Sequence, residues 1–217
     1  MHPTSRWYKS RMALELPGGL TLYLARHGQT QANVEKRFSG NKDTPLTPLG
    51  LEQAAQVGHI LKRELGDAPG YQFISSPLAR AVATMTIARQ IMGLPAEGFA
   101  TDNRLKEIDL GIWDQLTDEE ARALSPTLFE QRGNDKWHVR VPEGENYAEV
   151  AARVTDWLQE LKTDTIAISH GATTRILRGL LAGLDWREMS ALDEPQGVVF
   201  RVNGNQVVKL EHPRELG

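Results

Sequence analysis

The chain contains no cysteine, which excludes both a disulfide framework and catalysis by a thiolate. No apolar stretch approaches the roughly 20 residues that a membrane-spanning helix needs, and residues 1–19 contain no apolar signal-peptide core. The net charge is only −3, so the chain has no electrostatic footprint for nucleic acid. We therefore expect a cytoplasmic protein that binds neither membrane nor nucleic acid.

What the chain does have is the composition of an ordinary globular protein. Of its 217 residues, 40% are hydrophobic and 24% are charged, proportions that suit one sizeable domain. No repeat and no linker-like low-complexity stretch divides it. Residues 1–19 carry charges and a Pro-Gly-Gly sequence and are interpreted as an N-terminal arm or tail, which leaves residues 20–217 as a single domain.

Short apolar runs alternate with helix signals along the chain. The runs with the length of buried strands lie at 20–25, 71–75 and 165–169. N-cap residues, helix-start prolines and apolar stripes predict helices at 47–65, 76–92, 118–124, 146–162 and 172–181. The Asn-Gly pair at 203–204 predicts a C-terminal hairpin. We therefore expect an α/β fold, a three-layer sandwich whose mostly parallel central sheet carries helices on both faces and the hairpin at one edge.

Two near-identical tripeptides stand where two of these strands end. Arg26-His27-Gly28 follows the first apolar run, and Ser169-His170-Gly171 follows the last. In open α/β sheets, ligands bind at the carboxyl ends of the strands. We therefore expect the two histidines to lie at one edge of the sheet, and the arginine beside the first indicates chemistry on an anion.

Each candidate residue also has a simpler interpretation when it is taken alone. A lone histidine at a strand end is more often structural or exposed than catalytic. Arg26 alone would be a surface cation, and Glu107 alone would be a solvated carboxylate. Arg80 is more informative, because a cation near the start of a helix opposes the helix dipole and so serves another purpose. The simple interpretations weaken when all of these residues must occur together.

Three other chemistries lack their sequence patterns. A metal site could use His27, His170 and Glu107, but no His-Glu-x-x-His spacing occurs. Two arginines aimed at one pocket would also repel a dication. Neither the Gly-x-Ser-x-Gly of serine hydrolases nor a nucleotide P-loop is present.

Attack of a histidine on phosphorus remains open. A neutral imidazole meets no anion–anion repulsion there, and arginines neutralise and orient the phosphoryl oxygens. Their positive charge also lowers the pKa of a nearby histidine and keeps it neutral. A carboxylic acid must then protonate the leaving alkoxide.

Several sequence pieces occur in a characteristic order between about residue 20 and residue 180. The pieces are Leu24-Ala25-Arg26-His27-Gly28-Gln29-Thr30 with Asn33, Phe38-Ser39-Gly40, Asp43-Thr44-Pro45-Leu46-Thr47-Pro48-Leu49-Gly50, Ser75-Ser76-Pro77-Leu78-Ala79-Arg80-Ala81, Leu105-Lys106-Glu107-Ile108 and Ser169-His170-Gly171. Each piece is weak by itself, but all of them in this order are highly specific. The chain resembles the histidine phosphatase superfamily, in the branch that contains cofactor-dependent phosphoglycerate mutases and related phosphatases. The resemblance implies that residues 20–217 form one histidine phosphatase domain with a phosphoglycerate mutase-like fold.

The resemblance also implies a role for each matching residue. His27 resembles the nucleophile that becomes phosphohistidine, and Glu107 resembles the proton donor. The residues that resemble the phosphate pocket are Arg26, Arg80 and His170. The implied substrate or phosphate contacts are Asn33, Ser39, Gly40 and the backbone N–H of Gly171, which would lie at a helix N-terminus.

These roles predict a phosphomonoester hydrolase that acts on a small phosphorylated metabolite through a phosphohistidine, with no metal and no other cofactor. A cofactor-dependent phosphoglycerate mutase is the first alternative, and it would require 2,3-bisphosphoglycerate. A non-catalytic module that binds a phospho-ligand is the second, although such a module would not need Glu107. The sequence predicts no particular oligomeric state.

The chain departs from the family pattern at several places. Asn41 stands where many relatives have tryptophan, and Asp114-Gln115 follows Trp113 where many have Glu-Gly. Residues 131–140 replace the longer segment of the mutases. A shorter segment over the site should admit water to the phosphohistidine, which favours transfer of the phosphoryl group to water. Four basic residues of this segment either select an acidic substrate or form a solvated basic face: Arg132, Lys136, His138 and Arg140.

Metal independence can be tested directly. Arg26 and Arg80 supply the positive charge that magnesium supplies in other phosphoryl-transfer enzymes, so we expect phosphatase activity to survive exhaustive chelation with EDTA. Turnover is measured before and after chelation, and again after adding back one divalent metal at a time. Loss of activity that one metal restores would favour the metal-hydrolase alternative.

Overall fold

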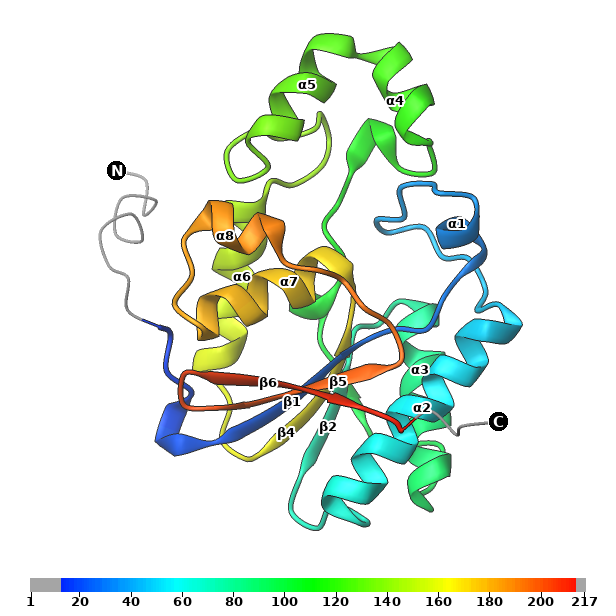
Figure 1. Cartoon of the computed structure of the whole chain (residues 1–217), viewed down its shortest axis with the longest axis vertical. Coiled ribbons are helices and arrows are strands. Elements are labelled where there is room, and N and C mark those ends of the chain that lie inside the picture. The colour runs from blue at the N-terminus through cyan, green and yellow to red at the C-terminus, as the bar shows by residue number, and fades with distance from the viewer. Residues whose placement is uncertain (1–12, 214–217) are drawn as a thin grey trace.

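The computed structural model describes residues 13–213 (Figure 1). Residues 1–12 of the predicted N-terminal arm or tail lie outside the described residues. The rest of that segment packs on the protein, because the Leu14 N–H donates to the Leu180 carbonyl oxygen at 2.9 Å and Leu16 is buried. Residues 13–19 therefore form a packed arm.

A six-stranded sheet lies at the centre of the described chain (Figure 1). Its strands are β1 (Thr21–Arg26), β2 (Gln72–Ser75), β3 (Ala100–Thr101), β4 (Thr165–Ser169), β5 (Val198–Asn203) and β6 (Gln206–Glu211). Their order across the sheet is β3-β2-β4-β1-β5-β6. Neighbouring strands from β3 to β1 pair in parallel, and β5 pairs in an antiparallel manner with both β1 and β6. The predicted mostly parallel sheet with a hairpin at its edge is confirmed, and the hairpin turn lies one residue later than predicted, at Gly204-Asn205.

Helices complete the three layers. The α-helices of residues 13–213 are α1 (Gln31–Val34), α2 (Pro48–Leu65), α3 (Ala79–Met92), α4 (Asp118–Leu124), α5 (Pro126–Asn134), α6 (Tyr147–Gln159), α7 (Gly171–Leu181) and α8 (Trp186–Ala191). Short 3-10 helices are η2 (Pro17–Gly19), η3 (Asn103–Leu105) and η4 (Gly111–Trp113). The α2–α3 pair covers one face of the sheet and α6 and α7 cover the other, while α4 and α5 lie together at the top of Figure 1. The predicted α/β sandwich is confirmed; α1, α5 and α8 were not predicted.

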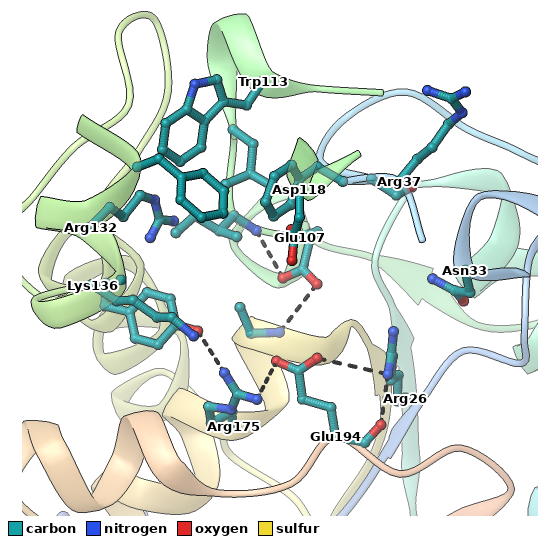
Figure 2. A pocket seen from close by; sticks show the side chains of 18 of the residues that line it. Arg26, Asn33, Arg37, Glu107, Trp113, Asp118, Arg132, Lys136, Arg175 and Glu194 are labelled. Carbon is teal, nitrogen blue, oxygen red and sulfur yellow. Dashed lines mark hydrogen bonds and ion pairs between the residues drawn. The ribbon is translucent and has the colours of Figure 1, made fainter. Parts of the chain in front are cut away.

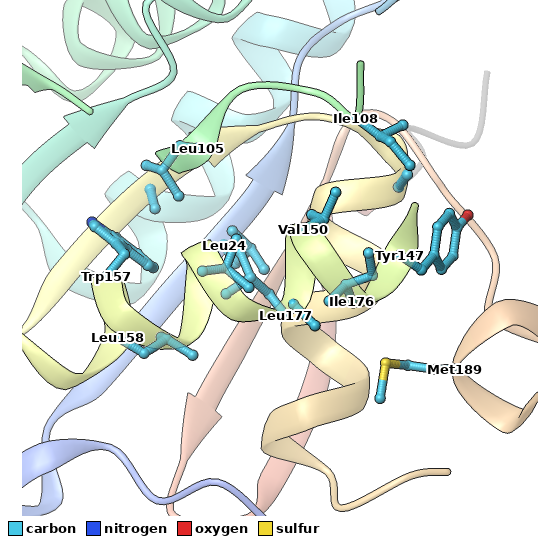
Figure 3. Packing of buried hydrophobic residues seen from close by; sticks show 14 of the residues in the cluster. Leu24, Leu105, Ile108, Tyr147, Val150, Trp157, Leu158, Ile176, Leu177 and Met189 are labelled. Carbon is cyan, nitrogen blue, oxygen red and sulfur yellow. The ribbon is translucent and has the colours of Figure 1, made fainter. Parts of the chain in front are cut away.

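Side chains of β1 alternate between two cores, because successive residues of a strand point to opposite faces of the sheet. Leu22 and Leu24 pack with residues of α6 and α7, as Figure 3 shows around Leu24. Tyr23 and Ala25 pack with residues of α2 and α3. The strand is therefore buried on both faces, and its carboxyl end is held at a defined place between the two helical layers.

The two helices with a predicted proline start behave differently. Thr47 caps α2 as predicted, by accepting the Gly50 N–H at 3.1 Å. The Ser76-Pro77 prediction is wrong, because α3 begins at Ala79, two residues after Pro77. Asp43 supplies the cap instead: its carboxylate accepts the Ala79 N–H at 2.8 Å, while Ser76 Oγ accepts the Leu78 N–H before the helix and contacts His170.

Close packing of α2 on α3 generates a stability prediction. A Cβ at Gly58 would lie 2.7 Å from Ile91 Cβ and 2.8 Å from the Ala88 carbonyl oxygen. We expect Gly58→Ala to lower the free energy of unfolding by about 1–3 kcal/mol, because the helices must move apart. Gly133→Ala in α5 is the matched control: its Cβ meets nothing within 4 Å, and alanine favours a helix by roughly 0.5–1 kcal/mol. Urea unfolding measures both, and equal effects at the two positions would contradict the packing argument.

Candidate active site

The carboxyl ends of β1 and β4 bring the two histidines together. Arg26 and Ser169, the last residues of these strands, are paired in register, and the His27 N–H donates to the Ser169 carbonyl oxygen at 3.0 Å. The ring centroids of His27 and His170 are 5.0 Å apart, and both side chains are buried. The two histidines therefore meet at one edge of the sheet.

His27 is held in one tautomer. Its Nδ1 lies 2.7 Å from the Gly28 carbonyl oxygen, which can only accept a hydrogen bond, so Nδ1 carries the proton. Its Nε2 accepts a hydrogen bond from Arg80 Nε at 3.3 Å. Burial, followed by the charges of Arg26 and Arg80, lowers the pKa of His27 well below its usual value. The ring is therefore neutral, with its lone pair on Nε2.

The Arg80 guanidinium is buried beside this ring with its N–H groups engaged. Nη1 donates to the Lys42 carbonyl oxygen at 3.1 Å and to Asp43 Oδ1 at 2.9 Å. Nη2 donates to the carbonyl oxygens of Ser39 and Gly40, at 3.3 and 2.7 Å. Ser39 and Gly40, which the resemblance implied as substrate contacts, thus use their carbonyl oxygens to position Arg80.

The loop that holds Arg80 is itself held by Asp114, one of the departures from the family pattern. Its carboxylate accepts the Gly40 N–H at 2.8 Å and the Lys42 N–H at 3.2 Å. Gln115, where many relatives have glycine, has a φ of 75°, in the left-handed region. Its N–H donates to the Phe38 carbonyl oxygen at 2.8 Å. Asp114 and Gln115, which differ from the family pattern, therefore support the loop beside the site.

Two donors beside His27 have no hydrogen-bond partner among the described residues. Ser76 Oγ accepts the Leu78 N–H at 3.3 Å and lies 2.7 Å from His170 Nε2, so its hydroxyl donates to Nε2. Burial lowers the pKa of His170 well below its usual value, so the neutral ring carries its proton on Nδ1, which is buried and unpartnered. Arg26 Nη1 donates to the Glu194 carbonyl oxygen at 2.6 Å, whereas its Nε is buried and unpartnered. Because a buried donor without an acceptor is costly, these two groups indicate a place for an oxyanion.

Glu107 lies at the first turn of α7. Its carboxyl oxygens accept the N–H groups of Ile108 at 2.9 Å and of Ala172 and Thr173 at 3.2 Å each. Burial, followed by the nearby charge of Glu194, raises the pKa of this carboxyl. The helix N-terminus where an anion was expected thus holds the protein's own acid, which is biased toward its protonated form.

Glu194 is a site residue that no sequence pattern indicated. It lies in the connection from α8 to β5, where its Oε1 pairs with Arg175 at 2.9 Å and its Oε2 lies 3.8 Å from Arg26. A Cβ at Gly171 would be only 2.5 Å from the Glu194 carboxylate. Gly171, an implied phosphate contact, therefore also provides the space that Glu194 occupies.

A pocket of about 480 Å³ opens beside these groups, and some of them line it (Figure 2). The implied site residues that line it are Arg26, His27, Asn33, Ser39 and Glu107. The implied site residues outside its lining are Gly40, Arg80, His170 and Gly171. Lining residues that were not among the candidates include Tyr147, Arg175 and Glu194.

Asn33 combines a structural and a pocket position. Its Oδ1 accepts the Thr30 N–H at 3.1 Å, which closes the first turn of α1. The same oxygen accepts a hydrogen bond from Gln196 Nε2 at 3.1 Å, and that amide also donates to the His27 carbonyl oxygen at 3.0 Å. Gln196 therefore ties Asn33 to the histidine loop.

The four basic residues of the 131–140 segment divide into two pairs. Arg132 and Lys136 line the pocket. His138 and Arg140 lie outside the lining, and each pairs with a nearby carboxylate. Only the first pair can therefore contact a ligand in this pocket.

Metal-ligand clusters and membrane-spanning helices are both absent from residues 13–213. No three His, Asp or Glu side chains there gather closely enough to hold a metal ion. None of the helices in this range combines the length and the apolar character that crossing a membrane requires.

Named relatives of the chain include both mutases and phosphatases. Over 180 residues the chain is 35% identical to "Probable phosphoglycerate mutase GpmB" of Escherichia coli strain K12, and the match covers 78% of each protein. The solved α-ribazole phosphatase of Shigella flexneri has a TM-score of 0.76 and 27% identity, over 91% of this chain and 98% of that one. A mycobacterial glucosyl-3-phosphoglycerate phosphatase, solved in complex with VO3, has a TM-score of 0.71 and 26% identity, over 89% and 97% of the two chains.

The family assignment follows from a match over most of the chain. The sequence model described as "Histidine phosphatase superfamily (branch 1)" matches residues 22–207. This range includes the strand-end histidines, Arg80 and Glu107. As the sequence resemblance implied, the chain belongs to the histidine phosphatase superfamily, whose members include phosphatases and phosphoglycerate mutase-like enzymes.

Proposed function

We propose that this protein hydrolyses a small phosphomonoester through a phosphohistidine formed on His27. The observation that carries the proposal is the buried, neutral His27 ring, whose Nε2 bears the lone pair. Unpartnered donors of Arg26 and His170 lie beside it, and Glu107 provides an acid with a raised pKa. A nucleophile, an oxyanion site and a proton donor are thus combined in one pocket.

In the first step, His27 Nε2 attacks phosphorus, so that a P–N bond forms and the P–O bond to the ester oxygen breaks. Arg26 and His170 donate from Nε and Nδ1 to the phosphoryl oxygens. The hydrogen bond from Arg80 Nε to His27 Nε2 breaks as the P–N bond forms, and this N–H turns to a phosphoryl oxygen. The other N–H groups of Arg80 stay engaged by the protein, and Arg80 also contributes its positive charge. Glu107 gives its proton to the leaving oxygen, so a neutral alcohol departs and Glu107 becomes a carboxylate.

In the second step, water attacks phosphorus and the P–N bond breaks. The Glu107 carboxylate takes a proton from the attacking water, which restores the acid. Orthophosphate leaves, and His27 returns to its neutral form with the proton on Nδ1. The same two groups thus serve both half-reactions.

A phosphoglycerate mutase that uses the same residues is the second candidate, favoured by the name of the relative with 35% identity. The two reactions differ in whether water or a substrate hydroxyl accepts the phosphoryl group, and a mutase must exclude water by tight closure. The short 131–140 segment and the two phosphatases among the structural relatives favour hydrolysis. A module that only binds a phospho-ligand would have no use for an acid at Glu107.

The proposal also covers the need for a metal or cofactor, the cellular compartment and the class of substrate. Arg26 and Arg80 supply charge at the site, so the reaction needs no metal and no other cofactor. The proposed location is the cytoplasm, since a chain without cysteine does not depend on an oxidising compartment for its folding. A net charge of −3 supports a small phosphorylated substrate rather than nucleic acid as the partner.

Phosphate release tests the proposed function. We expect orthophosphate from several small phosphomonoesters, including 3-phosphoglycerate, and little exchange between 3- and 2-phosphoglycerate in a coupled enolase assay. The assay is run with and without 2,3-bisphosphoglycerate. Isomerisation that exceeds phosphate release many-fold would make the mutase the correct function.

His27→Ala is the matched variant for this assay. We expect it to abolish acid-labile phosphate on the protein, trapped by rapid quench, and to lower turnover by several orders of magnitude, because the covalent route is lost. Near-normal turnover in this variant would exclude His27 as the nucleophile.

The pH dependence tests the acid. A carboxyl loses its proton as the pH rises through its pKa, so the raised pKa of Glu107 keeps the acid form present to higher pH than usual. Turnover of alkyl phosphates should fall as the pH rises through that pKa.

Glu107→Gln should slow the hydrolysis of alkyl phosphates far more than that of 4-nitrophenyl phosphate, whose leaving group needs little help. Glu194→Gln removes a negative charge that raises the pKa of Glu107, so the fall in turnover of alkyl phosphates should move to lower pH. Equal losses on both substrates in Glu107→Gln would instead show a positional role.

A further inference from the structure

The pocket wall away from His27 carries three cations that the proposed mechanism does not use. Arg132 comes from the last turn of α5, Lys136 from the segment after it, and Arg175 from α7. Figure 2 shows Arg132 and Lys136 on the side of the pocket opposite Arg26 and Asn33. The three residues are called the cationic wall below.

Arg132 is the most informative member of the cationic wall. Only 6% of it is exposed, and its Nε is buried without a hydrogen-bond partner. Among the described residues no carboxylate pairs with it, and its Cζ lies 6.0 Å from the centre of the Tyr147 ring. Arg80 and Arg178, which are also buried, each pair with an aspartate at 2.9 Å. A buried guanidinium beside an open pocket and without such a partner indicates that an anion binds there.

The other two members add like charge. Burial, followed by the charges of Arg175 and Arg132, lowers the pKa of Lys136. Arg175 Nη1 donates to the Tyr147 hydroxyl at 2.9 Å, while its Nε is buried and unpartnered. Three cations that face one pocket repel one another, and a bound anion would remove that repulsion.

Two acidic side chains also face the pocket. Glu194 pairs with Arg175 at 2.9 Å and lies 3.8 Å from Arg26, so its charge is shared between these arginines. Asp118, at the start of α4, lines the pocket but is exposed to water, which screens its charge. Within residues 13–213 neither forms an ion pair with Arg132 or Lys136, whose charges are therefore left to a ligand.

We propose that the cationic wall is a second anion subsite, which binds a carboxylate or a second phosphate of the substrate while the phosphoryl group lies at His27. The substrate class is then a small phosphomonoester with a second anionic group, and a pocket of about 480 Å³ suits such a molecule. This inference rests on the proposed function, because that function places the phosphoryl group at His27.

Binding measurements separate this subsite from catalysis. Calorimetry on His27→Ala, which cannot form a phosphohistidine, compares 3-phosphoglycerate with glycerol 3-phosphate, and propane-1,3-diol bisphosphate with the monophosphate. The members of each pair differ by one anionic group. We expect the more anionic member to bind roughly 10- to 100-fold more tightly, the range of charge-assisted hydrogen bonds. The pair with the larger ratio identifies the second group as a carboxylate or a phosphate.

Substitutions assign this preference to residues. In the His27→Ala background, Lys136→Met and Arg132→Met should each reduce the affinity ratio by about tenfold, while keeping the apolar stem. Arg140→Met is the matched control, because Arg140 belongs to the same segment but pairs with Glu149 outside the pocket lining. Arg140→Met should leave the affinity ratio within each ligand pair unchanged. Lys136 is only partly buried, so Lys136→Met decides the question even where Arg132→Met does not fold.

The outcomes distinguish the two proposals. Equal affinities within both ligand pairs, or a ratio that Lys136→Met leaves unchanged, would overturn the second anion subsite. Failure of the wild-type protein to release phosphate from any phosphomonoester, 4-nitrophenyl phosphate included, would instead overturn the proposed function, since the affinity ratio is read from binding alone.

Discussion

Burial of the Arg80 guanidinium is the constraint on which the rest of the site depends. A buried guanidinium needs an acceptor for each N–H, and the loop from Ser39 to Asp43 provides them together with His27. Asp43 in turn accepts the Ala79 N–H and so determines where α3 begins. The charge of Arg80, with burial, keeps His27 neutral. One cation therefore links the shape of a loop, the start of a helix and the protonation state of the proposed nucleophile.

The first turn of α7 holds two carboxyl groups in unequal environments. Glu107 is partly buried and accepts backbone N–H groups, and its pKa is raised by loss of hydration and by its acidic neighbour. Glu194 is partly exposed and is paired with arginines. Environments that differ in this way separate the roles of two acids, because one is biased toward its proton and the other is held as an ion-pair partner. In the proposed mechanism, Glu194 therefore acts through its charge on Glu107 rather than by touching the reacting atoms.

Sequence patterns predicted what depends on local signals. The apolar runs located β1, β2 and β4, and the α/β alternation placed both histidines at strand ends, where the topology brings them together. The start of α3 was mispredicted because its cap, Asp43, lies 36 residues before Ala79. Glu194 was missed for the same reason: its carbonyl oxygen meets Arg26 across 168 residues of sequence. The short helices α1, α5 and α8 were missed as well. α1 and α8 span only four and six residues, and α5 lies in a polar segment without an apolar stripe.

The reacting groups and the cationic wall differ in how they are built into the fold. His27 and His170 follow strands that are buried on both faces, so their positions are coupled to the central sheet. Arg132 and Lys136 belong to the α4–α5 layer, which is anchored by Trp113: its ring stacks with Phe38 and contacts Phe129, and its Nε1 donates to Ser125 Oγ at 2.8 Å. This layer is also held by backbone hydrogen bonds from Tyr147 and Ala148 and by the Arg37–Glu120 ion pair, none of which involves a strand of the sheet. Its inward-facing residues can therefore change without moving the strand ends. Under the proposed function, selection of the substrate can therefore vary through this layer while the residues proposed to attack phosphorus keep their positions.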